Sequence, residues 1–581
     1  MVRGMKKTDP IIWSITDGYH ASINQFNYLT GESQHAELDK LFEGKVFDQQ
    51  DAPDIVSALI DRCGWSIPEY CVYKKIFGTM NKNENPLNLN TFIDSILYSL
   101  SLRGHTGSFE IVNRKILSHH MCHALSAYHC SPFENCLVIS SSTVGDNIRY
   151  SESIFQKNVM IDHYSPSYIV GPSSILSDVG HICKQHISPE VTRCSPESYM
   201  DYAEKVVNLG GYFNATVNLI RGSELLADYT RCMQALPDYQ AWLTGEYFQK
   251  KNIQSNPMRA WDLTWEQDPN HERKNVWTEE DEMLHLVAVV KTSLENVKHT
   301  IMSKPVQKKI SKSDNNIILV GNTFSHQLLT GHLKRTFPQY NFFVPPDPND
   351  SGLSFGISNW KAAQLGWKGY DYDRRPKRQF SGIPFNMEGL GDAFLKSIDI
   401  SVKSFADLLI QGNVIGFIQG NVENGNRSLG NRSILCDATN LESMNKINTI
   451  RKNKEAWYEN FSSICRLEDA PKWFITDNYD NLYNNTFCVN TTNHFRVKCP
   501  GAVNNYNMAQ VQTVTSESHP ILHSLLSCYN NVYFNAPFCI KGNHLLNSWE
   551  TAKEIYNESD LDYVVIVYNE GKGSKLRLLY K

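Results

Sequence analysis

The apolar run Val414-Ile-Gly-Phe-Ile418 leads directly into a loop rich in glycine and arginine, Gly420-Asn-Val-Glu-Asn-Gly-Asn-Arg427-Ser-Leu-Gly-Asn-Arg432-Ser-Ile-Leu435. A short apolar run bounded by turn residues is typical of a buried strand. Glycines allow close approach of the backbone to a ligand, and the two arginines offer planar forks for phosphate or carboxylate. The stretch therefore predicts a strand followed either by an anion-binding loop or by an ordinary structural turn.

Short apolar runs alternate with longer amphipathic stretches along the rest of the chain, and this pattern predicts an α/β fold. We expect further strands at Ile11–Ile15, Cys136–Ser140, Ile317–Val320 and Tyr563–Val567. One amphipathic helix is predicted over Glu279–Met302, because apolar residues recur there at helical spacing. No internal repeat is visible in the sequence.

With 581 residues, the chain is long enough for two large domains. Between residues 367 and 390 the apolar pattern gives way to Gly, Tyr, Pro and the basic run Asp373-Arg-Arg-Pro-Lys-Arg378. We expect a linker there, between an N-terminal domain (1–366) and a C-terminal domain (391–581). The basic run Arg374–Arg378 is expected to be solvated, with contact to a phosphate as the alternative.

The composition excludes several classes of protein. The hydrophobic fraction of 41% and the net charge of −5 exclude a largely disordered chain and a nucleic-acid coat. The 14 cysteines include no CxxC pair, which favours a reducing compartment over a disulfide scaffold or a zinc ribbon. No apolar stretch approaches the roughly 20 residues that a membrane span needs. We therefore expect a soluble, cytoplasmic protein with no membrane partner.

A second chemical signal is the histidine pair in Ser118-His119-His-Met-Cys-His123-Ala124. On a helix, residues four apart lie on one face, close enough to chelate one metal ion. Ordinary histidines give the same spacing, so a third ligand is needed. Asp350, in the loop Val344-Pro-Pro-Asp-Pro-Asn-Asp350-Ser-Gly352, is a candidate that spacing alone does not pair with the histidines. Two histidines and one carboxylate with open positions favour Fe(II) or a similar divalent ion.

Four ordered stretches resemble motifs of the NodU/CmcH-type O-carbamoyltransferase family, collinearly over most of the chain. Thr16-Asp-Gly-Tyr-His20-Ala-Ser22 resembles the family's G-x-x-x-H-D-x-S. The stretch from His119 to Glu134 is similar to H-H-x-x-H-A-x-S-A-F/Y-x-x-S-P-F-E, and the loop around Asp350 is similar to V-P-P-x-x-x-D-x-G. The Gly/Arg loop resembles G-R-M-E-F-G-P-R-A-L-G-N-R-S-I-L.

The resemblance implies an N-terminal actin-like, ATPase-superfamily domain, similar to tRNA threonylcarbamoyl-transfer proteins, and a C-terminal YrdC-like α/β domain. The YrdC-like half would make carbamoyl-adenylate from ATP and carbamoyl phosphate. The metal-bearing half would transfer the carbamoyl group to a hydroxyl of a sugar, an antibiotic or a modified nucleoside. Mg²⁺ would accompany ATP, and the chain could act as a homodimer.

The resemblance also implies roles for individual residues. His119, His123 and Asp350 would hold the metal ion, which would clamp the phosphate of the adenylate. His20 would act as general base toward the acceptor hydroxyl. The nucleotide and carbamoyl phosphate would be bound by Gly321, Asn322, Arg427, Arg432, Ser433, Lys452, Lys454 and Asn535.

The chain departs from the family pattern mainly in the half that would form carbamoyl-adenylate. At several motif positions the family has a polar, charged or glycine residue and this chain has a different one. The residues of this chain at those positions include Ser142, Asn322, Glu459, Gln510, Pro537 and Cys539. Each lost contact to an anionic ligand weakens binding by about 1–3 kcal/mol. Three interpretations stay open: an active but divergent carbamoyltransferase, a nucleotide- and metal-binding pseudoenzyme that serves as a binding module, and an enzyme with a different acyl donor.

Overall fold

The computed structural model describes most of the chain. The described residues are 10–17, 21–42, 52–74, 87–142, 146, 150–165, 297–298, 300–370, 375, 378–425, 427–450, 462–503, 507–539, 545–570 and 573–580. Three of the expected site residues, His20, Lys452 and Lys454, lie outside these ranges, as does Glu459. Of the predicted helix Glu279–Met302, only residues 297–298 and 300–302 are described, and they are helical.

The first sheet has five strands in the order β3-β2-β1-β4-β5. An antiparallel meander of three strands is followed by two strands parallel to β1. The strands are β1 (Ile11–Thr16), β2 (Ser22–Asn27), β3 (Ser33–Glu37), β4 (Tyr70–Lys74) and β5 (Ser108–Ile111). The central strand β1 is buried on both faces, because the helices α2 (Ala52–Ser57) and α3 (Leu87–Leu102) cover one face and α14 (Leu353–Gln364) covers the other. The strand predicted at Ile11–Ile15 is confirmed.

The second sheet repeats this arrangement, in the order β10-β9-β6-β7-β8. Again a three-stranded antiparallel meander is extended by two strands parallel to its first member. The strands are β6 (Asn135–Ser141), β7 (Tyr150–Gln156), β8 (Val159–Tyr164), β9 (Asn316–Val320) and β10 (Asn341–Phe343). The helices that accompany them are α4 (His119–Tyr128), α12 (Lys304–Ser311) and α13 (Gln327–Thr336).

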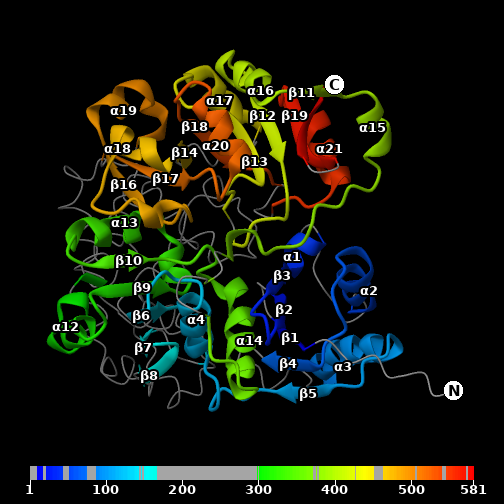
Figure 1. The fold of residues 1–581 in the computed structure, drawn as a ribbon, viewed down its shortest axis with the longest axis vertical. Coiled ribbons are helices and arrows are strands. Elements are labelled where there is room, and N and C mark those ends of the chain that lie inside the picture. Colours follow the sequence, from blue (N-terminus) through cyan, green and yellow to red (C-terminus); the bar gives the residue numbers. More distant parts are fainter. Residues whose placement is uncertain are drawn as a thin grey trace, which may run out of the picture.

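The two sheets lie side by side with α4 and α14 between them (Figure 1). Two sheets of identical strand order are the arrangement of the actin-like ATPase fold. The structure therefore confirms the actin-like class, and it shows a duplication that the sequence conceals.

The C-terminal part is built on one ten-stranded mixed sheet, in the order β11-β20-β19-β12-β13-β18-β14-β17-β16-β15. Its strands are β11 (Ile398–Ile400), β12 (Ile415–Ile418), β13 (Arg432–Asp437), β14 (Ser462–Arg466), β15 (Phe474–Ile475), β16 (Cys488–Thr491), β17 (Met508–Val514), β18 (Tyr533–Pro537), β19 (Tyr563–Glu570) and β20 (Gly573–Leu579). The helices α16 (Val402–Ile410) and α20 (Pro520–Ser527) pack on one face. This is the α/β domain expected of a YrdC-like unit.

The remaining helices of the C-terminal part lie mainly against the other face of this sheet. They are α17 (Leu441–Ile450), α18 (Ala470–Trp473), α19 (Asn493–Lys498) and α21 (Trp549–Glu558). Their apolar core is continuous with that of the second sheet. The two described α-helices not yet named are short: α1 (Leu38–Leu41) and α15 (Gly391–Leu395). No helix among the described ranges is long and apolar enough to cross a membrane.

The segment after α14 packs against both halves of the protein. Arg375 donates hydrogen bonds to the carbonyls of Tyr128 (3.2 Å) and Ser131 (3.3 Å), and its guanidinium lies 4.2 Å from the centre of the Tyr128 ring. Arg378 is 4% exposed. The expected solvated run is therefore wrong for these two arginines, because polar groups and rings brought together by the fold replace water around each guanidinium. The domain boundaries at 366 and 391 stay a prediction.

Candidate metal centre and the surrounding loops

The helix that carries the histidines begins at His119. Ser118 caps it, since its hydroxyl accepts a hydrogen bond from the Met121 N–H (3.1 Å). The Asp146 carboxylate accepts a second bond from the His119 N–H (2.7 Å). These bonds satisfy backbone donors that a helix N-terminus leaves free. The predicted helical placement of His119 and His123 is confirmed.

Close packing of α4 on α14 brings the third side chain to the histidines. At Gly356 of α14, a Cβ atom would lie 2.0 Å from the carbonyl oxygen of Cys122 in α4, so only glycine permits this contact. The 3₁₀ turn Asp350–Gly352 leads directly into α14. Asn349 caps the turn, because its side-chain oxygen accepts the Ser351 N–H (3.2 Å).

The three expected ligands converge in one buried place. The Nε2 atoms of His119 and His123 are 3.0 Å apart, and Oδ1 of Asp350 lies 3.3 Å from each of them. These are spacings at which one ion could contact all three atoms, which lie within 4.8 Å of one another. The structure thus brings Asp350 to two histidines that lie more than 200 positions before it in the sequence.

The electrostatics of this group suit a divalent metal ion. Burial lowers the pKa of His123 to about 4, so its imidazole is neutral at pH 7 and can offer a lone pair. Burial acts to raise the pKa of the Asp350 carboxyl, but the two histidines lower it, and it ends well below its ordinary value. Within the described residues, Oδ1 of Asp350 makes no hydrogen bond of good geometry, although the two histidine nitrogens lie 3.3 Å from it. A bound cation would remove the penalty of this unsatisfied buried oxygen, so the residues fit the metal that the family implies.

A second charged pair lies next to the histidines. Nζ of Lys74, at the end of β4, is 3.4 Å from the Asp146 carboxylate that caps α4, and both side chains are buried. The hydroxyl of Ser142, where the family has a carboxylate, is buried without a hydrogen-bond partner in the described part of the chain. Sequence reasoning missed Lys74. The one feature that could have indicated it is its position as a charged residue at the end of an apolar strand.

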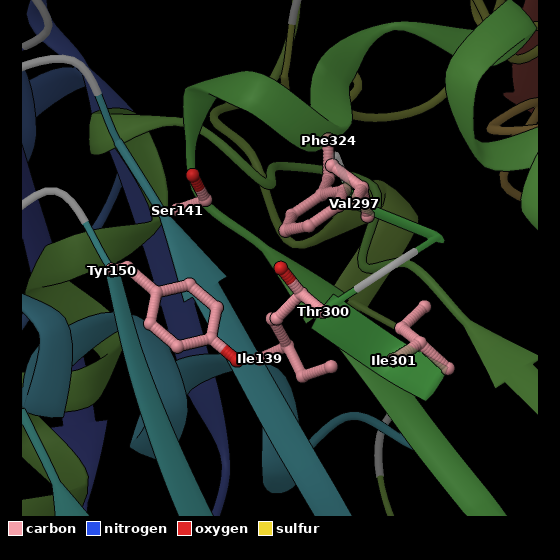
Figure 2. A pocket seen from close by; sticks show the side chains of 7 residues that line it. All are labelled: Ile139, Ser141, Tyr150, Val297, Thr300, Ile301 and Phe324. Carbon is pink, nitrogen blue, oxygen red and sulfur yellow. The ribbon is translucent and has the colours of Figure 1, made fainter. Parts of the chain in front are cut away.

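The loop after β9 approaches β6 closely at Gly321. This glycine has a φ of +99°, and a Cβ there would lie 2.1 Å from the carbonyl oxygen of Ser141. Oδ1 of the adjacent Asn322 is buried and has no described partner. A small hollow lies beside the loop. Figure 2 shows its lining residues, Ile139, Ser141, Tyr150, Val297, Thr300, Ile301 and Phe324.

Glu423 organises the Gly/Arg loop. One oxygen of its buried carboxylate accepts the N–H groups of Leu429 (2.8 Å), Asn431 (2.7 Å) and Arg432 (2.9 Å). Gly420, which precedes it, has a positive φ of 49°, as the loop's glycine content leads one to expect. Sequence reasoning did not single out Glu423, although it stands in the quoted motif.

The two arginines of the loop have different surroundings. Arg432 is fully buried, and its terminal nitrogens donate to the carbonyls of Gln419 (2.7 Å) and Gly420 (3.0 Å). Burial lowers its pKa to about 10. Arg427 is partly exposed and donates to the carbonyl of Ser325 in the Gly321 loop. Arg432 therefore stabilises the turn itself, and its contact with phosphate stays a prediction.

The remaining expected ligands of the nucleotide are held within the loop. The Ser433 hydroxyl accepts the Gly430 N–H (3.1 Å). Nδ2 of Asn535 donates to the Ser428 carbonyl (2.8 Å), and its Oδ1 accepts the Ser428 hydroxyl (2.9 Å). Gln512 of β17 donates to the carbonyl of Leu429 (2.7 Å). The loop is thus fastened to β13, β17 and β18.

A buried ion pair that sequence reasoning missed joins the first sheet to the Gly/Arg loop. Nζ of Lys40 donates to Glu37 (2.9 Å) and to the carbonyls of Glu423 (2.7 Å) and Gly425 (2.6 Å). Glu37 in turn accepts the Gly425 N–H (2.8 Å). No pattern could have indicated it, since Glu and Lys three residues apart are common on protein surfaces.

Comparison with known proteins identifies relatives of this chain. A family model described as "Carbamoyltransferase C-terminus" matches residues 406–569. The 3'-hydroxymethylcephem-O-carbamoyltransferase of Streptomyces clavuligerus is 30% identical over 32% of this chain and 34% of its own length. Nodulation protein NolO of Bradyrhizobium diazoefficiens is 26% identical over 43% of this chain and 48% of its own length. The chain thus matches between a third and a half of these named relatives.

Likeness to solved structures adds nothing to this identification. T. kodakarensis HypF matches with 10% identity and a TM-score of 0.32, over 62% of this chain and 48% of its own, which is too low to support an argument. The fold assignment rests instead on the duplicated strand order. The C-terminal part of the chain thus matches a carbamoyltransferase family model, and parts of the chain are similar to a cephem carbamoyltransferase and to a nodulation protein, in line with the resemblance that the four collinear motifs indicate.

Proposed function

We propose that this protein makes carbamoyl-adenylate from ATP and carbamoyl phosphate in its C-terminal half, and transfers the carbamoyl group to a substrate hydroxyl at the His119–His123–Asp350 centre. The observation that carries the proposal is the convergence of three buried ligand atoms in a chain whose C-terminal part matches a carbamoyltransferase family model. The acceptor is a hydroxyl-bearing small molecule or a modified nucleoside.

His119, His123 and Asp350 would hold the metal ion, and two histidines with one carboxylate favour Fe(II). When bound, such an ion supplies Lewis-acid stabilisation of negative charge on a phosphate or carbonyl oxygen. The protein keeps the ligands ready by burial, which holds His123 neutral, and by the cap interactions that fix the start of α4. A dry, rigid centre of this kind strengthens electrostatic interactions with the reacting group.

His20 is proposed as the general base that takes the proton of the acceptor hydroxyl. Support comes from the strands on either side of it in the sequence. Thr16 ends β1 and Ser22 begins β2, and their hydroxyls are 3.0 Å apart. The Ser22 hydroxyl also donates to the carbonyl of Ser351 (3.0 Å), the residue after Asp350. The start of β2 therefore lies next to the turn that carries Asp350, and His20 itself is outside the described residues.

ATP, with Mg²⁺, and carbamoyl phosphate are proposed to bind near the Gly/Arg loop. Arg427 is the best placed cation there, because it is partly exposed and its guanidinium reaches the Gly321 loop. Asn322 adds a buried oxygen that has no partner in the described residues and could accept a bond from a ligand. Lys452 and Lys454 complete the proposed set through the family resemblance. No observation favours the pseudoenzyme alternative.

The deciding experiment is carbamoyl-phosphate-dependent exchange of pyrophosphate into ATP, combined with mass spectrometry of candidate acceptors. We expect exchange by the wild-type protein without any acceptor, and a mass increase of one carbamoyl group when a suitable hydroxyl is supplied. A double variant, His119→Ala with His123→Ala, is the matched control, because it should keep the exchange and lose the transfer. Absence of exchange in the wild type with intact fold would refute adenylate formation and favour another acyl donor.

A further inference from the structure

Arg378 lies where three parts of the protein meet. Its terminal nitrogens donate to Oδ1 of Asp347 (2.7 Å) and to the hydroxyl of Ser126 (2.8 Å). Its guanidinium lies 3.9 Å from the centre of the Phe355 ring in α14. Its backbone carbonyl accepts a bond from the side-chain amide of Asn424 in the Gly/Arg loop. The side chains of all these polar partners are buried.

Two of these partners belong to the elements that supply the metal ligands. Ser126 stands on α4, three residues after His123, and Asp347 stands three residues before Asp350 in the same loop. The Ser126 hydroxyl also donates to the carbonyl of Gly352 (2.7 Å), at the end of the turn that carries Asp350. Arg378 thus bridges α4 and the aspartate loop without contacting any ligand itself.

The chemistry of the bridge favours arginine. A planar guanidinium presents several donors in a fixed fork, so it can bind a carboxylate and a hydroxyl at once while stacking on a ring. A buried ion pair contributes little net stability, since desolvation offsets the attraction between the charges. The Asp347–Arg378 pair is almost fully buried, with side chains 0% and 4% exposed. The pair therefore serves to hold α4 and the aspartate loop in a fixed relative position rather than to stabilise the fold.

We propose that Arg378 is a positioning residue that sets the separation between α4 and the aspartate loop, and so sets the affinity of the metal centre. Through Asn424, the same residue links this arrangement to the Gly/Arg loop. The inference rests on the proposed metal centre. Removal of partners outside the direct ligands of a metal site typically lowers metal affinity roughly 10- to 100-fold.

The test compares Arg378→Met with the double variant Arg378→Met/Asp347→Leu in the full chain, using Co²⁺ as the probe. Co²⁺ affinity is measured by chelator competition, its coordination by the visible spectrum, and stability by thermal unfolding. The single variant leaves Asp347 buried and unpaired, so both stability and affinity should fall. The double variant removes that charge, so stability should recover, while Co²⁺ affinity should stay roughly 10- to 100-fold weaker with an altered spectrum. Recovery of wild-type affinity and spectrum in the double variant would overturn the positioning role.

Ser126→Ala provides a milder variant that keeps both charges. It removes the hydroxyl between Arg378 and Gly352, and we expect weaker Co²⁺ binding with little change in the unfolding temperature. Wild-type Co²⁺ affinity in this variant would also count against the proposal, even if the Arg378 variants fail to fold.

Arg466→Met is the matched control. The Arg466 guanidinium makes hydrogen bonds to Asp469 (2.6 Å), Ser527 (3.1 Å) and Asn530 (2.7 Å), all in the C-terminal part and away from the metal-bearing elements. This variant should lower the unfolding temperature and leave Co²⁺ affinity unchanged. A wild-type protein that binds no Co²⁺ would refute the metal centre and the positioning role with it, whereas normal binding in every variant would refute only the role of Arg378.

Discussion

The metal centre and the Gly/Arg loop both keep residues of the family motifs, but the protein uses these side chains differently. At the centre, Oδ1 of Asp350 is buried without a described hydrogen-bond partner, and two histidine nitrogens face it. In the loop, the terminal nitrogens of Arg432 and the amide of Asn535 are engaged by the protein's own groups. Retention of a motif residue therefore does not show that it faces a ligand. The unsatisfied buried atom is the more direct indication of a binding site.

The largest effect is expected from removal of a metal ligand, which should stop the reaction at the metal centre and leave the reaction at the Gly/Arg loop. Asp350→Ala or His123→Ala should abolish stoichiometric metal binding and carbamoyl transfer, because two remaining ligands hold a divalent ion weakly. Pyrophosphate exchange should persist, since the Gly/Arg loop contributes no metal ligand. Elemental analysis measures the bound metal, mass spectrometry of the acceptor measures transfer, and the exchange assay measures adenylate formation. Metal retained at one ion per chain in the combined variant would refute the ligand assignment.

His20→Asn tests whether His20 is the general base that acts on the acceptor hydroxyl. A general base contributes about 10²- to 10⁴-fold, so transfer should fall by that factor while exchange continues. The rate of carbamoylation at saturating acceptor is the measurement, and unchanged metal content is the control. Loss of exchange along with transfer would show that His20 serves both halves or the fold.

The two arginines of the loop should respond in different ways. Arg432→Ala leaves the carbonyls of Gln419 and Gly420 without a charged donor, and should lower the free energy of unfolding by about 3 kcal/mol. This loss should abolish both exchange and transfer. The milder Arg432→Lys keeps the charge but loses the fork, and should raise KM for a donor if the side chain reaches phosphate.

Arg427→Ala should instead raise KM for ATP or carbamoyl phosphate with little effect on unfolding, because Arg427 is partly exposed. Denaturant titration and initial rates distinguish the two arginines. Unchanged KM values for both donors in the Arg427 and Arg432→Lys variants would favour the structural-turn interpretation of the whole loop.

The last expected effect concerns pH. Among the described histidines, those with a lowered pKa all precede residue 327, and burial lowers the pKa of His129 and of His326 to about 3. In the unfolded chain these histidines have a pKa near 6.5 and bind a proton below that pH, whereas in the folded protein they stay neutral. The free energy of unfolding should therefore fall as pH drops from 6.5 toward 4, by about 1.4 kcal/mol per pH unit for each of His129 and His326.

His129→Phe should flatten this dependence, because a phenyl ring can replace the imidazole against Trp367, whose ring centroid is 5.1 Å away. Urea unfolding at several pH values measures the slope. An unchanged slope in this variant would mean that His129 takes up its proton in the folded state.

The sequence predicts the central strands well and the connections between distant segments poorly. Ile11–Ile15 and Ile317–Val320 are apolar runs buried on both faces of their sheets, so composition and length reveal them. The duplicated sheet order leaves no trace in the residues, because strand order depends on pairing rather than on any local pattern. The histidine helix was predictable from its i, i+4 spacing.

Only those site residues that belong to a recognisable sequence motif were predictable. Asp350 joins the histidines through the packing of α4 on α14, which no spacing encodes, and family resemblance supplied the pairing. The bridge made by Arg378 was mistaken for solvated chain, because its partners Asp347 and Ser126 lie 31 and 252 positions away. Charged residues look solvent-exposed in a sequence until the fold supplies their partners.

The contact between Gly356 and Cys122 makes the centre insensitive to many changes elsewhere in the core. The distance between the two ligand-bearing helices is set there by main-chain atoms touching, with no side chain between them. Side chains elsewhere in the core can change in volume over evolutionary time without altering that spacing. The spacing of the ligand-bearing helices in this chain can therefore withstand changes of core side chains that would shift a contact made through side chains.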